Sequence, residues 1–241
     1  MVIRVSFAVS IVLVCASFVN AQQRTRWSDP EFEASGFAGG SFAEDFHFST
    51  PVSGSTQETS RTVGIHYGSG YQVGARVNQN LNDYWGAALE YSFANQPLQF
   101  TNLSPTVQSL SVGQTVHHFL YNVSYIPLGG WERFRPYAQL GAGATLFFIH
   151  GDRDQALASG VYLRDSWKFT ANWGGGFKYM VDEQTALLLD FKDSVSGIPT
   201  YGLPSAAQVV NGQYQPGIGS TGRLNIWQVN FGVAFRWNDW Y

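Results

Sequence analysis

Trp167 to Asp193 reads WKFTANWGGGFKYMVDEQTALLLDFKD, and this stretch decides the fold. Apolar and polar residues alternate before Asp182, and the alternation resumes after Gln184. Successive side chains of a strand point to opposite faces, so the stretch predicts an antiparallel hairpin that turns at Asp182-Glu183-Gln184. One face of its first arm is aromatic: Trp167, Phe169, Ala171, Trp173, Gly175, Phe177 and Tyr179. The other face is polar: Lys168, Thr170, Asn172, Gly174, Gly176 and Lys178.

The N-terminal segment has the features of an export signal. Arg4 precedes the apolar run of residues 5–19, and Val19-Asn20-Ala21 offers the small residues of a cleavage site. We therefore expect a signal peptide at residues 1–21, and we divide the exported chain into a short segment at 22–30 and a domain at 31–241. Cleavage after Ala21 removes Cys15, the single cysteine, so no disulfide stabilises the mature chain. A lipoprotein site at Cys15 is the alternative.

The composition points to a membrane protein built of strands. Charged residues make up 13% of the chain, against about 25% in ordinary soluble domains, while aromatic residues make up 16%. After the signal, no stretch approaches the roughly 20 apolar residues of a spanning helix. Low charge, many aromatics, 26 glycines and an export signal together predict a transmembrane β-barrel. The weakly acidic chain has no Lys/Arg-rich patch, which excludes a nucleic-acid partner.

The alternation recurs along the chain and predicts an all-β, eight-stranded antiparallel up-and-down barrel. The expected strands are residues 31–42, 71–78, 85–93, 112–126, 137–149, the two arms of the 167–193 hairpin, and 224–237. Long connections (44–70, 94–111, 151–166, 194–222) alternate with short ones, as in outer-membrane barrels, so both termini fall on the short-turn, periplasmic side. We therefore expect residues 22–30 to be a periplasmic segment and residues 31–241 to be an outer-membrane barrel domain. Residues 62–67 extend a strand above the membrane in this interpretation. The first strand is the hardest to orient, because Phe37 falls on the face opposite its other apolar residues.

The charged residues of the strands share the polar face. A Lys or Arg on the lipid face would cost roughly 2–4 kcal/mol at the membrane midplane, so this face is expected to line the interior. The predicted interior charge network is Arg76, Glu90, Lys168, Lys178, Asp190, Lys192 and Arg236. Two interpretations follow: a paired polar core that plugs the narrow interior, which we favour, or a small gated pore. The predicted aromatic girdle at the strand ends is Trp85, Tyr125, Trp167, Tyr179 and Trp237.

No catalytic, cofactor-binding or metal-binding residues are assigned. His117 and His118 are neighbours on a strand and point to opposite faces. His117 is the candidate base of a lipid-modifying enzyme, with Ser109 or Ser111 nearby, but an interfacial histidine is the simpler interpretation. His47, His66 and His150 lack metal-ligand spacing. The glycines of 141–143 and 174–176 are not followed by the helix of a phosphate loop.

Three segments carry a resemblance to a known family: Pro136 to Ala144 (PYAQLGAGA), Gly174 to Tyr179 (GGGFKY) and the closing Asn230 to Trp237 (NFGVAFRW). They resemble the small outer-membrane β-barrel family, which includes the eight-stranded membrane domain of outer membrane protein A and similar porin-family proteins. The resemblance covers essentially the whole mature chain and implies an architecture, not an activity. No peptidoglycan-binding domain follows the barrel, so wall tethering is not expected.

The sequence thus predicts a non-enzymatic integral protein of the outer membrane of a Gram-negative cell envelope. Its expected role is structural or adhesive, through four long surface-exposed loops. A narrow passive pore and a lipid-A-modifying enzyme are the alternatives. The expected partners are outer-membrane lipids and lipopolysaccharide, the barrel-assembly machinery, and an extracellular ligand of the loops. We expect a monomer without cofactors.

Overall fold

The computed structural model describes residues 31–54, 60–129, 132–150, 161–210, 213–219 and 221–237. The predicted signal peptide and the 22–30 segment lie outside the described residues. Eight antiparallel strands form a closed barrel, as the alternation predicts. In chain order they are β1 (Phe32–Ala43), β4 (Gly70–Asn80), β5 (Trp85–Asn95), β7 (Ser109–Tyr125), β8 (Phe134–His150), β9 (Ser166–Met180), β10 (Thr185–Gly197) and β13 (Arg223–Trp237).

Neighbouring strands pair in chain order around the barrel, and the last strand closes onto the first. The closing register joins Phe32 to Trp237 at one end and Ala43 to Ile226 at the other. No strand edge is left open in the wall, which matters in lipid because no water is there to satisfy unpaired backbone groups. The described residues contain no helix long and apolar enough to cross a membrane.

Tight turns form where short polar segments separate the strands. The Asn82 side-chain oxygen accepts hydrogen bonds from the backbone N–H groups of Tyr84 and Trp85, at 2.9 and 3.0 Å. Asp182 does the same for Gln184 and Thr185 in the hairpin between β9 and β10. These side chains stabilise the turn by replacing a backbone acceptor. We call this end of the barrel the short-turn end, and the opposite end the long-loop end.

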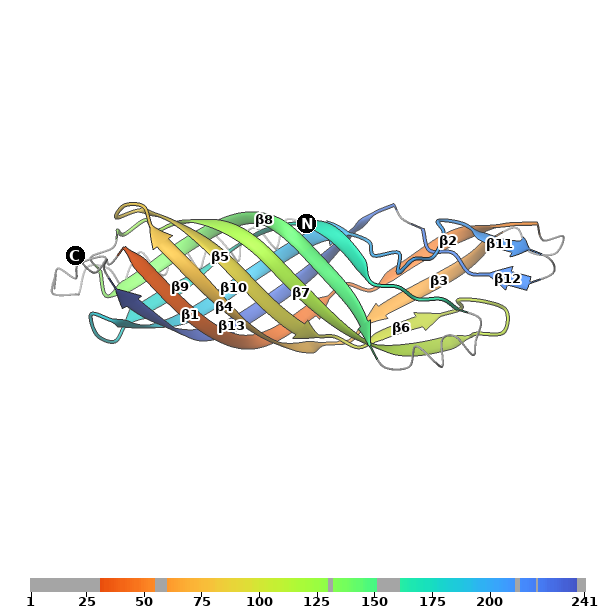
Figure 1. Ribbon diagram of the computed structural model, residues 1–241, viewed down its shortest axis with the longest axis horizontal. Coiled ribbons are helices and arrows are strands. Elements are labelled where there is room, and N and C mark those ends of the chain that lie inside the picture. Colours follow the sequence, from red (N-terminus) through yellow and green to blue (C-terminus); the bar gives the residue numbers. More distant parts are fainter. Residues whose placement is uncertain are drawn as a thin grey trace, which may run out of the picture.

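Beyond the long-loop end, the long connections form strands of their own (Figure 1). They are β2 (Phe46–Ser53), β3 (Ser60–Tyr67), β6 (Leu98–Thr101), β11 (Ala207–Val210) and β12 (Gln213–Gln215). β2, β3 and β6 form antiparallel pairs that join the extended part of β7, while β11 lies parallel to β2. Of these five strands in the long connections, the sequence predicts only β3, as the 62–67 extension. The other loops appear irregular in sequence because Ser, Thr, Gly and Pro interrupt their short apolar runs.

These strands enclose a second core, which we call the apolar cap. Its buried residues come from the long connections and from the ends of the barrel strands that they extend. They are Val63, Ile65, Tyr67, Ala94, Leu98, Phe100, Leu103, Val107, Leu110, Val112, Val116, Phe147, Ile149, Val161, Leu163, Ile198, Tyr201, Leu203, Ile218, Leu224 and Ile226. Toward the long-loop end, the barrel interior therefore changes from polar side chains to apolar ones. A smaller buried apolar cluster, Met180, Ala186, Leu188 and Ala234, lies at the short-turn end.

Candidate functional site

The centre of the barrel interior holds a group of paired charges. Arg76 projects from β4 and contacts two carboxylates: Asp190, with Nη2 2.6 Å from Oδ2, and Glu90, with Nη2 2.9 Å from Oε2. Lys192 donates to the other oxygen of Glu90, and the Tyr137 hydroxyl donates to Asp190. All five side chains are buried. Each charge faces an opposite one, which is the condition for keeping ions out of water.

A second group lies nearer the short-turn end. Lys178 Nζ donates to Glu33 Oε1 at 2.7 Å, and Arg236 Nε lies 3.9 Å from the other oxygen of Glu33. Glu33 is a buried charge that the sequence prediction missed, as is Arg135, the cross-strand partner of Lys178. The signal was available, because Glu33 is out of phase with Phe32 and Ala34 on the first strand. It also lies directly opposite Arg236 in the closing register.

Lys168 is the exception among the seven predicted interior charges. Its side chain is half-buried, and it forms no ion pair with any residue that the structure describes. The reason is its height in the barrel: Lys168 pairs in register with Thr145, close to the long-loop end. The neighbouring interior side chains there are neutral, with Thr145 Oγ1 2.6 Å from Thr170 Oγ1 and 2.8 Å from His118 Nδ1.

Phe37 also lies inside the barrel, which explains why the first strand is hard to orient from its sequence. Its ring is buried and makes two cation–π contacts: the ring centroid lies 5.7 Å from the Arg76 guanidinium carbon and 5.2 Å from Lys192 Nζ. Gly74 makes room for the ring, since a Cβ on Gly74 would lie 2.4 Å from it, and a Cβ on Gly232 would lie 2.8 Å from the Phe37 Cβ. An aromatic face attracts cations, so Phe37 belongs to the charged group rather than to the lipid surface.

The apolar cap closes the long-loop end above these charges. At its centre, the hydroxyls of Tyr67 and Tyr201 lie 3.2 Å apart, and Gln114 donates to Tyr201 at 2.7 Å. Burial raises the pKa of the Tyr201 hydroxyl well above its usual value, so the group stays neutral. The interior is thus filled by ion pairs at its centre and by side chains of the cap at one end.

A carboxylate at the side of the cap fixes the start of the loop strands. Asp45 Oδ1 accepts the Tyr67 N–H at 2.8 Å, and Asp45 Oδ2 lies 3.0 Å from His66 Nδ1. Burial alone would raise the pKa of this carboxyl, but the hydrogen bonds from His66 and Tyr67 outweigh it and lower the pKa.

The outer wall carries the apolar side chains. Four of the predicted girdle residues lie at the short-turn end: Trp85, Tyr125, Tyr179 and Trp237. Trp85 and Tyr125 are cross-strand partners with ring centroids 5.0 Å apart. Trp237 is half-buried, because it stacks on Phe32 and Phe235. The fifth, Trp167, lies at the long-loop end of β9 and contacts Phe119.

His117 faces outward, as expected, but the proposed nucleophiles are not beside it. Ser111 is six residues away on the same strand, or about 20 Å at 3.3 Å per residue. Instead, the imidazole of His117 forms two hydrogen bonds. Its Nδ1 lies 2.9 Å from the Tyr91 hydroxyl, and its Nε2 lies 3.3 Å from Thr115 Oγ1. His118 is buried in the interior. Among the described residues, no group of three or more His, Cys, Asp or Glu could hold a metal ion.

Comparisons with known proteins agree with this architecture. Residues 11–235 match the family described as outer membrane protein beta-barrel domain. Among solved structures, OprG from Pseudomonas aeruginosa is similar at 16% identity, with 89% of this chain and 100% of that chain covered and a TM-score of 0.56. Neisserial surface protein A is similar at 11% identity, with 86% and 97% covered and a TM-score of 0.50. No curated protein matches the chain. The match over most of its length shows that the chain belongs to the outer-membrane β-barrel family and is an integral protein of that membrane.

Proposed function

We propose that this chain is a non-enzymatic barrel that carries a folded cap outside the cell for contact with other surfaces. The observation that carries the proposal is the apolar cap itself. Loops that merely connect strands need no buried core, whereas these contribute five strands and the buried residues of a common interior. A rigid scaffold that presents ordered loops is a common arrangement for recognition.

The same proposal fixes the orientation of the chain. Short turns face the periplasm and long loops face outward in barrels of this class, so β2, β3, β6, β11 and β12 lie outside the cell. The girdle residues at the short-turn end then mark the inner boundary of the membrane. The β11–β12 hairpin lies at the edge of the cap sheet, where β11 pairs with β2 and β12 is the last strand.

A closed interior supports contact rather than conduction. An ion would have to break the Arg76–Glu90 and Arg76–Asp190 pairs and then pass the apolar cap. An eight-stranded barrel is just wide enough for side chains to fill its interior. We therefore expect no steady conductance when the full chain is refolded into a planar bilayer. Steady conductance of the wild type would replace this proposal with a narrow passive pore.

The adhesive part of the role is tested with the β11–β12 hairpin. Cells that express the full chain are compared with cells in which a Gly-Ser linker replaces residues 207–215, on monolayers of epithelial cells. We expect attachment to fall while the barrel still folds, as judged by its heat-dependent gel mobility. Unchanged attachment would exclude the hairpin as a contact surface and leave a role in envelope structure.

The enzymatic alternative has a separate readout. His117→Ala would change the acyl pattern of lipid A in a mass spectrum if this histidine acted as a catalytic base. We expect no change, because its partners are Tyr91 and Thr115 rather than Ser109 or Ser111. A changed acyl pattern would show that the chain is an enzyme.

A further inference from the structure

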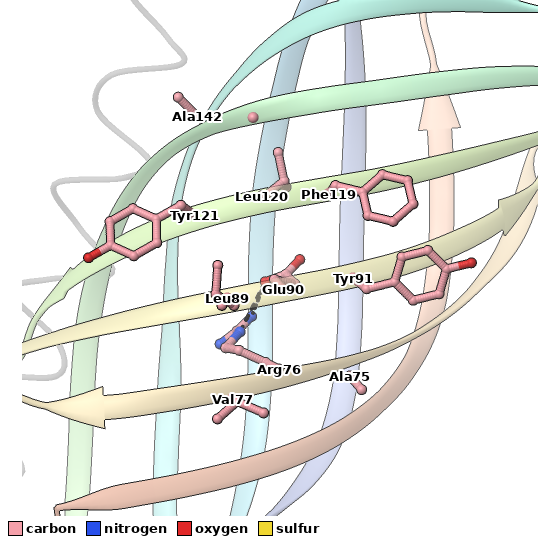
Figure 2. A pocket seen from close by; sticks show the side chains of 11 residues that line it. Ala75, Arg76, Val77, Leu89, Glu90, Tyr91, Phe119, Leu120, Tyr121 and Ala142 are labelled. Carbon is pink, nitrogen blue, oxygen red and sulfur yellow. Dashed lines mark hydrogen bonds and ion pairs between the residues drawn. The ribbon is translucent and has the colours of Figure 1, made fainter.

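An apolar groove crosses the outer wall of the barrel over β4, β5, β7 and β8. Two rows of outward side chains form its sides, each following the cross-strand register. Ala75, Tyr91 and Phe119 form the row nearer the long-loop end, and Val77, Leu89 and Tyr121 form the other. Figure 2 shows the rings leaning apart, with Tyr121 turned one way and Tyr91 and Phe119 the other. The floor is the part of the wall between the rows, where Arg76, Glu90 and Leu120 point inward.

The size and surroundings of the groove restrict what can fill it. Its volume is about 520 Å³, within the range of roughly 300–1,000 Å³ that is common for ligand sites. Leu89 is 67% exposed and Tyr121 is 53% exposed, so the groove opens outward. This face of the membrane-spanning strands is in contact with hydrocarbon, and the apolar sides of the groove match a hydrocarbon chain.

A polar pair lies beside the groove on its long-loop side. The Tyr91 hydroxyl is 2.9 Å from His117 Nδ1, and His117 is the cross-strand partner of Phe93, one step nearer the long-loop end. Thr115 adds a hydroxyl 3.3 Å from His117 Nε2. Both nitrogens of His117 therefore have partners, and the Tyr91 hydroxyl, which His117 orients, keeps a second hydrogen-bonding position for a ligand. An amphiphile with its tail in the groove would bring its polar head to this pair.

We propose that the groove binds one acyl chain of a membrane lipid and that the Tyr91 hydroxyl, oriented by His117, holds the headgroup of that lipid. The lipid comes from the leaflet on the long-loop side, since the polar pair lies on that side of the groove. Lipid tails are as apolar as the wall, so the hydrophobic effect does not select the site. Selection comes from packing in the groove and from hydrogen bonds to the headgroup, as for helices that associate within membranes.

The test uses the full chain refolded into vesicles of phosphatidylethanolamine and phosphatidylglycerol. A phosphatidylethanolamine with a photoreactive diazirine on one acyl chain is included, and labelled peptides are mapped by mass spectrometry. We expect labelling around Leu89 and Tyr121 to exceed labelling around Phe191 and Phe231 on the opposite wall, which are similarly exposed. Even labelling of both walls would show ordinary surrounding lipid and overturn the proposal.

Two pairs of variants separate the groove from its polar neighbours. Ala142→Phe fills the groove beside Tyr121, while Ala138→Phe places the same ring outward on the same strand, away from the groove. We expect the first to lower labelling of the groove roughly threefold and the second to leave it unchanged, because packing rather than apolarity defines the site. Equal effects of the two variants, or none, would overturn the acyl-chain site.

Tyr91→Phe removes the hydroxyl beside His117, and Tyr121→Phe removes one on the other side of the groove. We expect only the first to reduce the amount of phosphatidylethanolamine that stays bound in native mass spectra. Equal retention by both variants would overturn the headgroup contact. Heat-dependent gel mobility confirms in each case that the barrel is folded, and the conductance result does not affect these outcomes.

Discussion

The membrane-spanning part of the barrel, called the span below, and the apolar cap share strands but bury opposite kinds of side chain. The span buries polar and charged side chains, and the cap buries apolar ones. Within the span, charges such as Arg76 and Glu90 are buried inside, while Leu89 and Phe231 are exposed outside. Within the cap, Ile65 and Phe100 are buried, and Asp45 and His66 lie toward the outside. The strand β7 belongs to both regions: it buries Asn122 in the span and Leu110 in the cap. The surrounding medium decides which kind of side chain is buried, because hydrocarbon accepts an apolar wall and water does not.

The largest effect is expected from the charges at the centre of the span. Glu90→Ala leaves Lys192 and Arg76 buried without their shared carboxylate, so we expect a loss of about 3–5 kcal/mol in the free energy of unfolding. Urea unfolding of the refolded chain in lipid vesicles measures it. Leu89→Val, one residue away and facing lipid, serves as the control and should cost about 0.8 kcal/mol for its one methylene. Similar losses in the two variants would show that the interior pairs do not stabilise the barrel.

The cap should unfold independently of the membrane-spanning part of the barrel. Ile65→Ala removes a fully buried side chain from the cap, and we expect a local loss of about 3 kcal/mol. Limited proteolysis of the long loops should accelerate, while heat-dependent gel mobility of the barrel stays unchanged. Thr62→Ala, exposed on the same strand, is the matched control and should stay within about 0.5 kcal/mol. Loss of the barrel together with the cap would mean that the two regions form one cooperative unit.

A smaller effect is expected where the span packs an aromatic ring inside. Gly74→Ala places a Cβ 2.4 Å from the Phe37 ring, and we expect a loss of about 1–3 kcal/mol from overpacking. Gly36→Ala on the neighbouring strand is the control, since nothing lies within 4 Å of a Cβ there. Adding Phe37→Leu should restore part of the stability of the Gly74 variant. If both glycine variants unfold alike in urea, Phe37 does not occupy the interior.

The smallest effect concerns Asp45 at the side of the cap. Its pKa is lowered in the folded state, so it contributes stability above its ordinary value near 3.8, and this contribution is lost as the pH falls through the lower, folded value. Asp45→Asn should therefore speed proteolysis of the cap at neutral pH, by an amount equivalent to less than about 1 kcal/mol because the site is partly exposed. An acid-stable protease should detect a shrinking difference as the pH falls below 3.8. A difference that persists in acid would exclude the carboxylate as its cause.

The span was predictable from the sequence because one physical rule governs it. Alternation of period two places Trp173 outside and Lys178 inside, independently of the structure of the loops. The structure confirms the eight barrel strands predicted in this way. Glu33 was missed because its charge sits in a first strand whose phase is blurred by Phe37. The closing register, which places Glu33 opposite Arg236, agrees with the interior position that its phase against Phe32 and Ala34 already indicates.

The cap and the groove depend on contacts that a single sequence does not reveal. Val63, Ile65 and Tyr67 alternate as a strand should, but Leu98 and Phe100 form a run too short to identify. Pairing between β2 and β11 joins segments more than a hundred residues apart. The groove depends on the directions in which the rings of Tyr91 and Tyr121 turn (Figure 2), and no pattern of residue types specifies these directions.

The parallel contact between β2 and β11 has a consequence for the order of assembly. β2 follows the first barrel strand and β11 precedes the last, so the pairing of Val52 with Ala207 spans the seam between β1 and β13. These two segments come together only once the seam has joined, because until then they sit on opposite margins of an unrolled sheet. Protease resistance of the β2–β11 contact therefore reports a finished cylinder, and newly inserted chains whose seam is still open should be cut there first.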